Sequence, residues 1–214
     1  KVQFNLHDYS PGMRYSIDGS FIGTGISSIV KDLHGGLRRG ELGTVLAMFQ
    51  GGKTSVLTII GGSAVVNGLR VLHLIYEDFY SDIGQMYDRI FEEKQFKFTE
   101  STGKLRLVDS TSLVPDLSDI TSLVQEYKAD VLIVDYAELI PSKGSAGEEG
   151  KRHRLRDTFV KLRRLAGLTN IAVWTAHQAT VRVSDHGDAL LRLTPDRISE
   201  CKHIGATTDV LLGF

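Results

Sequence analysis

Several classes of protein are excluded by what this 214-residue chain lacks. It has one cysteine, Cys201, so no disulfide can form within the chain, and a reducing, cytosolic setting fits. No apolar run reaches the roughly 18–20 residues that a membrane-spanning helix needs, and no segment has the pattern of a signal peptide. Basic residues are not in excess, because 25 lysines and arginines oppose 26 acidic residues. Any nucleic-acid site must therefore be a local patch.

The organisation of the chain is simple. A hydrophobic content of 42% in this length is enough to bury one sizeable core, so one α/β domain is expected over residues 21–214. Residues 1–20 are polar and contain the breaker Pro11-Gly12, which predicts an N-terminal arm or linker. Because the chain begins at Lys1, we expect an excised domain or a processed fragment.

Short apolar runs recur along the chain and are typical of buried parallel strands. These predicted strands are Thr44–Ala47, Val71–Tyr76, Val131–Val134, Ile171–Thr175 and Val210–Phe214, with a weaker one at Leu105–Val108. Helical patterns separate them at Lys53–Asn67, Ser81–Glu93, Leu117–Tyr127 and Arg152–Ala166, and Ser81 is the expected N-cap of the second. This alternation predicts a mostly parallel central sheet with helices on both faces. Ligands of such sheets bind at the carboxyl ends of the strands.

The segment Ala47-Met-Phe-Gln-Gly-Gly-Lys-Thr54 nearly matches the phosphate-loop pattern G-x-x-x-x-G-K-[ST], with alanine in place of the first glycine. Glycines let backbone N–H groups surround an anion, and the helix that follows points its positive end at the phosphates. An ordinary glycine-rich turn is the alternative, but the motif follows a predicted strand and opens a predicted helix. We therefore expect a P-loop that binds ATP or another NTP with Mg²⁺. The expected nucleotide-binding residues are Ala47, Gln50, Gly51, Gly52, Lys53, Thr54 and Ser55.

Two carboxylates stand at predicted strand ends. Asp135 ends an apolar strand and is expected, with the Thr54 hydroxyl, to hold Mg²⁺; a turn cap is the alternative. Glu77 follows the strand after the phosphate-loop helix and is expected to activate the attacking water. Its alternative is a capping acid for the next helix, and Asp78 and Glu138 are rival carboxylates.

A polar pair follows the strand Ile171–Thr175. Gln178 at this tip can hydrogen-bond the γ-phosphate or the attacking water, and His177 could do the same or be a satisfied polar residue. The residues alone do not separate these two readings. Together with Lys53 and Glu77, Gln178 completes the expected catalytic set.

With these motifs in order, residues 20–214 resemble the C-terminal helicase domain of DnaB-type replicative helicases, a RecA-like branch of the P-loop NTPases. The resemblance is carried by these segments: Thr24-Gly-Ile-Ser-Ser28, Gly35-Gly-Leu-Arg-Arg-Gly-Glu-Leu42, Asp135-Tyr-Ala-Glu-Leu139, Trp174-Thr-Ala-His-Gln178, Ser199-Glu-Cys-Lys202 and Ala206-Thr-Thr-Asp-Val-Leu-Leu212. It implies Glu77 as the water-activating acid and Gln178 as the sensor of the γ-phosphate.

The resemblance also implies partners. They are single-stranded DNA in a central channel, further copies of the chain in a homo-hexamer, and primase with other replisome proteins, in the cytoplasm of a bacterial cell or a phage-infected host. The family usually continues into a hairpin whose basic residue reaches the neighbouring subunit's nucleotide. We expect that hairpin to be missing, since the sequence stops at Phe214, and we expect the N-terminal primase-interacting domain to be absent too.

Two linking regions are polar, Pro141–Lys151 and Thr180–Pro195. Basic residues in or close to them are candidates for holding DNA phosphates, and a solvated charged face is the alternative. They are Lys151, Arg152, Arg154, Arg182 and Arg192.

Two other functions remain open. A KaiC-like regulatory ATPase would not track DNA, and the adjacent Glu77-Asp78 pair echoes that group. A recombinase-like filament protein would bind DNA without unwinding it.

Overall fold

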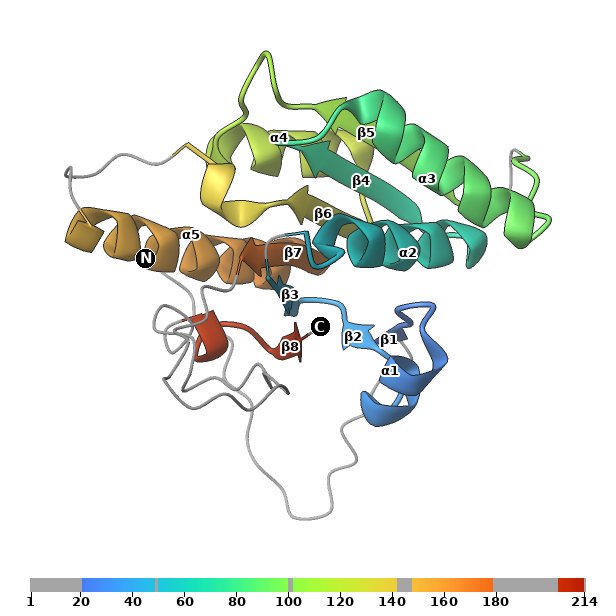
Figure 1. Cartoon of the computed structure of the whole chain (residues 1–214), viewed down its shortest axis with the longest axis horizontal. Coiled ribbons are helices and arrows are strands. Elements are labelled where there is room, and N and C mark those ends of the chain that lie inside the picture. The colour runs from blue at the N-terminus through green and yellow to red at the C-terminus, as the bar shows by residue number, and fades with distance from the viewer. Residues whose placement is uncertain (1–20, 49, 100–101, 142–147, 179–203, 214) are drawn as a thin grey trace, which may run out of the picture.

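A six-stranded sheet in which every strand runs parallel forms the centre of the computed structural model, which describes residues 21–48, 50–99, 102–141, 148–178 and 204–213 (Figure 1). The strand order is β5-β4-β6-β7-β3-β8. The bounds are β3 Leu42–Ala47, β4 Arg70–Ile75, β5 Lys104–Asp109, β6 Val131–Asp135, β7 Ala172–Gln178 and β8 Val210–Gly213. All six predicted strands are present. The expected arm, residues 1–20, lies outside the described residues.

The central strands are apolar on both faces because each face is covered by helices. Along β6, Val131 and Ile133 pack into one core cluster while Leu132 and Val134 pack into the other, as the two-residue period of a strand requires. The edge strand β5 is only partly covered, so it carries charged residues among its apolar ones. This explains why β5 is the weakest strand signal in the sequence.

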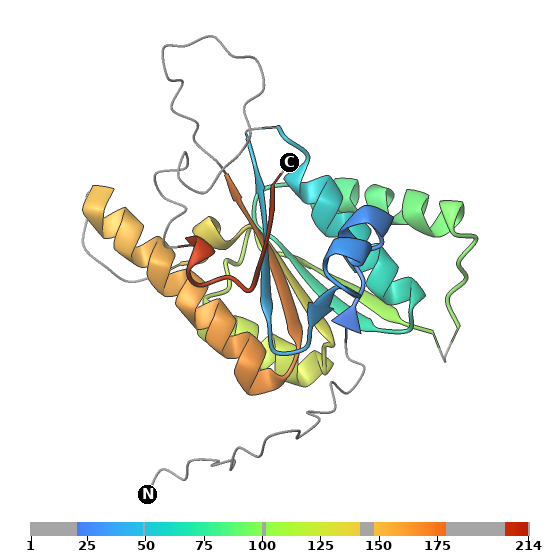
Figure 2. The ribbon, with the colours of Figure 1, turned by 90° about the horizontal axis from the view of Figure 1, so that it is seen from below.

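Four long helices build the outer layers. Helices α2 (Lys53–Val66) and α3 (Tyr80–Glu93) pack on one face, and α4 (Leu117–Tyr127) and α5 (Glu148–Thr169) pack on the other (Figure 2). The predicted α4 has the observed bounds. Asp116 caps it by accepting from the N–H groups of Ser118 and Asp119. The layered α/β fold expected from the alternation is confirmed.

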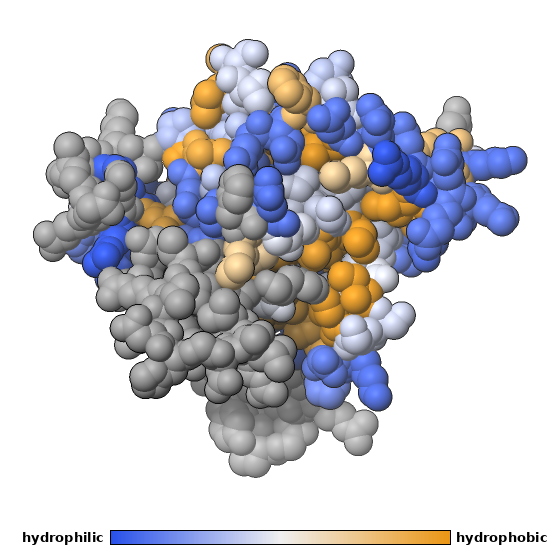
Figure 3. All heavy atoms as spheres, in the orientation of Figure 1, coloured by the Kyte–Doolittle hydropathy of each residue, from blue (hydrophilic) through white to orange (hydrophobic). Residues whose placement is uncertain are grey.

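The N-terminal part of the domain holds elements that the sequence did not predict. Strands β1 (Phe21–Ile22) and β2 (Leu37–Arg38) form a small antiparallel pair around helix α1 (Ser27–Asp32). Ile22 and Leu37 are buried against the α2 side of the core. The space-filling view shows apolar residues gathered where α2 approaches this pair (Figure 3). In the described part of the chain, no helix is both long and apolar enough to cross a membrane.

One predicted helix start is wrong. Ser81 was expected to cap α3, but the N-cap is Phe79, which has an extended backbone and no side-chain cap bond. Ser81 lies inside the first turn, where its hydroxyl contacts Asp82 at 3.4 Å. The N-cap lies two residues earlier than predicted because Asp82 N–H and Ile83 N–H already find an acceptor in the Phe79 carbonyl.

Close packing of α2 on α3 depends on a glycine. The hydroxyl of Tyr87 reaches the buried His73 ring and bonds Nδ1 at 2.9 Å. A methyl group on Gly61 would lie 2.2 Å from that hydroxyl and 2.8 Å from Ile133. The absence of a side chain at position 61 therefore lets Tyr87 enter the core.

We predict that Gly61→Ala lowers the free energy of unfolding by about 1–3 kcal/mol, because the added methyl overpacks the core and displaces Tyr87. The matched control is Gly84→Ala in α3, where the nearest atom is 4.0 Å away. There the higher helix propensity of alanine should add up to about 1 kcal/mol. Urea unfolding measures both, and equal stability of the two variants would contradict the packing argument.

Candidate nucleotide-binding site

The loop between β3 and α2 turns so that the start of the helix faces a cavity. Gln50 and Gly52 adopt left-handed backbone angles, with φ of 58° and 79°, and Gly52 is the N-cap of α2. Lys53, Thr54 and Ser55 are the first helical residues, so their N–H groups have no acceptor within the helix. These donors and the positive end of the helix make the loop suited to an anion.

Alanine at position 47 is accommodated without strain. Ala47 is the last residue of β3 and is not among the residues with positive φ, so this position does not need glycine. Gly51 is the stricter requirement: a Cβ there would lie 2.8 Å from the Met48 carbonyl oxygen and 2.9 Å from Ala47 Cβ. The departure from the motif therefore leaves the loop's backbone path intact.

The cavity at this loop has a volume of about 350 Å³ and lies where β3, β4 and β7 end. Its lining residues come from three segments that are far apart in the sequence: Gln50, Gly51, Gly52, Lys53, Thr54, Glu77, Asp78 and Gln178. Of the predicted nucleotide-binding residues, Ala47 is buried behind the loop and Ser55 is exposed on the first turn of α2; neither lines the cavity.

Asp135 lies just beneath this cavity at the end of β6 and is 4% exposed. Burial is the main cause that raises the pKa of Asp135 to about 6. The Thr54 hydroxyl lowers this pKa, the carboxylates of Asp78 and Glu77 raise it, and the Lys53 ammonium lowers it. In the described part of the chain, Asp135 Oδ2 has no hydrogen-bond partner.

The Thr54 hydroxyl lies near two carboxylates but has one proton to donate. It donates to Asp78 Oδ2 at 3.1 Å, so Asp135 keeps an unpartnered oxygen. A hydroxyl and a buried carboxylate with a free oxygen are the hard donors that Mg²⁺ prefers. Thr54 and Asp135 therefore fit the predicted metal, with Asp78 as a neighbouring carboxylate. Among the described residues no group of three or more His, Cys, Asp or Glu side chains could hold a metal without further ligands.

Glu77 lines the cavity and does not cap α3, since that helix has no side-chain cap bond. The Lys53 ammonium lies 5.6 Å from the centre of the Tyr136 ring. Burial, followed by the carboxylates of Glu77, Glu138 and Asp135, raises the pKa of Tyr136 to about 12. The environment of the cavity is therefore negative, and Lys53 is the one lysine or arginine among the described lining residues.

The polar pair at the end of β7 is divided between the cavity and the core. Gln178 lines the cavity, whereas His177 is 1% exposed and its Nδ1 bonds Glu138 Oε1. The β3–β7 ladder runs to Ala47↔Gln178, so Gln178 lies directly beside the start of the phosphate loop. The two residues that the sequence could not separate therefore occupy different environments. Glu138 is bonded to β7 and does not line the cavity.

Only some of the predicted DNA-binding residues lie in the described part of the chain. Arg182 and Arg192 lie outside the described residues. Lys151 and Arg152 belong to the first turns of α5, where Arg152 is exposed. This helix runs antiparallel to β7, so its N-terminal end lies toward the same edge of the sheet as the cavity (Figure 2).

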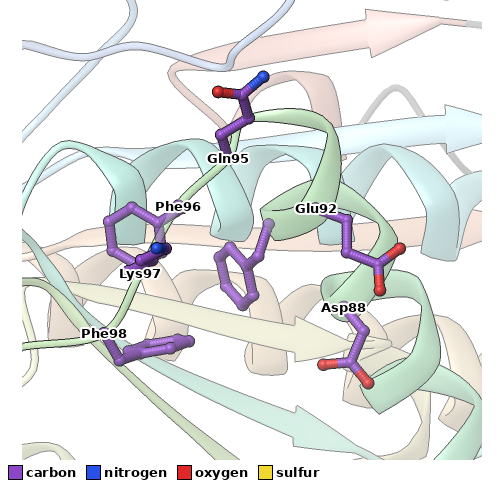
Figure 4. Close-up of a pocket in the computed structure, with 7 residues that line it drawn as sticks. Asp88, Glu92, Gln95, Phe96, Lys97 and Phe98 are labelled. Carbon is purple, nitrogen blue, oxygen red and sulfur yellow. The ribbon is translucent and has the colours of Figure 1, made fainter.

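A second cavity, of about 390 Å³, lies at the end of α3 and is not suited to phosphates (Figure 4). The carboxylates of Asp88 and Glu92 stand on one side of it, and the rings of Phe96 and Phe98 on the other. Lys97 is the one basic residue in its lining. With two acids against one base and no glycine loop in this lining, the cavity would repel an anion.

The fold defines the structural class, because a parallel six-stranded sheet covered by helices matches a RecA-like α/β fold. No family model and no curated protein matches the sequence. Among solved structures, the ATPase domain of G40P, a DnaB-type helicase, superimposes with a TM-score of 0.67 over 92% of this chain and 78% of that one, at 14% identity. The expected resemblance is therefore confirmed at the level of the fold.

Two features of the site were not predicted. Asp78 accepts the Thr54 hydroxyl and lines the cavity beside Glu77. Glu138 joins the segment after β6 to the end of β7. The available signal was a charged residue three positions after Asp135 and a histidine next to Gln178, but their pairing spans 39 residues and required the strand order.

We predict that Asp135→Asn raises the free energy of unfolding by about 2–3 kcal/mol at pH 7 without nucleotide or metal. In the folded chain the pKa of Asp135 is about 6 against an ordinary 3.8, so wild-type stability falls as the pH rises between these values. Asparagine carries no charge and avoids this loss. Urea unfolding measures the effect.

At pH 4 the wild-type carboxyl is largely protonated, so the advantage of asparagine should shrink below about 1 kcal/mol. Asp32→Asn, which changes an exposed aspartate in α1, is the matched control and should have little effect at either pH. A lower stability of Asp135→Asn at pH 7 would mean that the carboxylate is compensated in the folded chain.

Proposed function

We propose that this chain is the motor domain of an ATP-dependent replicative DNA helicase of the DnaB type. In this proposal it hydrolyses ATP or another NTP at the interfaces between subunits and uses the energy to translocate on single-stranded DNA. The observation that carries the proposal is the cavity that brings together Lys53, Thr54, Glu77 and Gln178 above the buried Asp135. The fold shared with the ATPase domain of G40P supports it.

Each residue has a proposed role that follows from its place. The N–H groups at the start of α2 and the Lys53 ammonium bind the β- and γ-phosphates. Thr54 and Asp135 would hold Mg²⁺, which supplies charge to the phosphates when it is bound. Glu77 orients and deprotonates the attacking water. Gln178 hydrogen-bonds the γ-phosphate and responds to its loss.

The proposed partners are single-stranded DNA, further copies of the chain in a homo-hexamer, and primase with other replisome proteins. A second subunit is supported by the charge of the cavity, where Lys53 alone among the described lining residues is basic and faces two acids. A triphosphate would need additional positive charge in its transition state, and a neighbour's basic residue provides such charge in many NTPases. Arg152 at the start of α5 is a proposed DNA contact together with Lys151, Arg182 and Arg192.

A KaiC-like regulatory ATPase is the second candidate, because Asp78 lines the cavity next to Glu77 and both carboxylates face the phosphate loop. The two functions separate in one assay. ATP turnover is measured with and without single-stranded DNA across a wide range of protein concentrations. A helicase motor should be stimulated by DNA once subunits assemble, whereas turnover that ignores DNA favours the regulatory ATPase.

We predict that Glu77→Gln lowers turnover by about 10²–10⁴-fold in the assembled protein while nucleotide affinity stays close to wild type. The amide keeps the shape of the side chain but cannot accept the proton of the attacking water. Steady-state turnover and equilibrium binding measure the two effects. The matched control is Glu93→Gln, an exposed carboxylate at the end of α3. Near-normal turnover of Glu77→Gln with loss in Asp78→Asn or Glu138→Gln would assign the base elsewhere.

We also predict that replacing both Arg182 and Arg192 with alanine weakens single-stranded DNA binding and flattens its salt dependence. Each lost phosphate contact should lower the slope of log K against log salt by roughly 0.7. Fluorescence anisotropy at several salt concentrations measures this slope. An unchanged slope would show that residues 180–195 do not contact the DNA backbone.

A further inference from the structure

The backbone ladders around β7 end at different residues. On one side, the ladder between β6 and β7 stops at Val134↔Thr175. On the other side, the ladder between β3 and β7 continues to Ala47↔Gln178. The last residues of β7 are therefore held by backbone bonds to the phosphate-loop strand, while Asp135, which still pairs with Ile75 of β4, is no longer paired with β7.

Side chains connect β7 to that segment where the ladder ends. The Thr175 hydroxyl donates to the Val134 carbonyl at 2.9 Å and accepts from Ala137 N–H at 3.0 Å, so it spans Asp135. Beyond it, Glu138 Oε1 accepts from His177 Nδ1 and from the backbone N–H of Gln178, the latter at 3.3 Å. One carboxylate oxygen thus holds two successive residues of β7.

The environment of this pair restricts its movement. The His177 ring is 1% exposed and stands edge-on to Phe159, with ring centres 6.3 Å apart and planes at 90°. The Glu138 side chain is 31% exposed and lies outside the cavity lining, whereas Gln178 is part of that lining. Glu138 therefore does not contact a bound phosphate from the cavity lining, but it holds a residue that can.

We propose that Glu138 and His177 are positioning residues that set the place of Gln178 relative to Asp135 and thereby give the cavity its preference for a triphosphate over a diphosphate. This inference rests on the proposed function, because it assumes that the cavity binds a nucleotide. It adds that the sensing of the third phosphate depends on a carboxylate that does not touch the nucleotide.

The test compares the affinities of the 214-residue chain for a non-hydrolysable ATP analogue and for ADP, each with Mg²⁺, by isothermal titration. Wild type should prefer the triphosphate. Glu138→Ala removes the shared acceptor and should reduce this preference between about two- and tenfold, the range expected for one hydrogen bond. The loss should come from weaker binding of the analogue, with ADP affinity unchanged, which a general loss of structure would not produce.

Two variants sharpen the result. Glu138→Gln keeps an acceptor oxygen at the same distance and should retain most of the preference. Glu138→Asp keeps the charge but withdraws the oxygen by one methylene, so its nucleotide preference should match that of Glu138→Ala in the same assay. If thermal unfolding shows that Glu138→Ala does not fold, Glu138→Asp takes its place. Glu93→Ala is the matched control for removing an exposed carboxylate.

The outcomes are distinct. A wild-type preference that Glu138→Ala and Glu138→Asp both leave unchanged overturns the positioning role while the proposed nucleotide site stands. A loss of ADP affinity equal to that of the analogue also overturns it, because Glu138 would then support the whole cavity. Binding of neither nucleotide by wild type, as expected for Lys53→Ala, overturns the proposed function and this inference with it.

Discussion

A charge buried in an apolar surrounding has to be compensated, and the carboxylate of Asp135 is compensated only in part by the described residues around it. The apolar strand β6 carries it inward, and Oδ2 is left without a partner. The cavity above contains one ammonium and two further carboxylates, so its own charges do not neutralise Asp135. A bound cation would recover the free energy that this arrangement costs the unliganded fold.

The parallel sheet converts this local constraint into a site. All six strands end at the same edge, so residues near positions 50, 77, 135 and 178 meet although they are far apart in the chain. In the strand order, β7 and β6 separate β3 from β4. The phosphate loop after β3 therefore faces the ends of β6 and β4 across the end of β7. This is the general position of ligands in open parallel sheets, where the strand order reverses direction.

Much of the fold could be predicted because its signals are local. Short apolar runs rich in β-branched residues mark strands that are buried on both faces, and a helical period over eleven residues set the bounds of Leu117–Tyr127. The pair β1–β2 and helix α1 could not be predicted, since two-residue strands and a six-residue helix are too short to show a period.

Some residues of the site could likewise be predicted from the sequence, and others could not. The phosphate loop is one continuous segment, so Lys53 and Thr54 could be placed from the sequence alone. The pairing of Glu138 with His177 depends on which strands are neighbours, and the different environments of His177 and Gln178 depend on strand alternation at the exact end of β7. Such information is absent from a single chain read in order.

The two ladders that flank β3 also have a mechanical consequence. Six residues of β3 are paired with β7 and four with β8, so the strand is held by backbone bonds along both of its edges. The phosphate loop follows β3 directly, so its start cannot slide along the sheet without breaking several backbone bonds together. When the contents of the cavity change, displacement is therefore expected in parts held by single side-chain bonds or by none. The segment after β4 is such a part, because Asp78 is held to the phosphate loop by one side-chain bond, from the Thr54 hydroxyl, and Phe79 is 77% exposed.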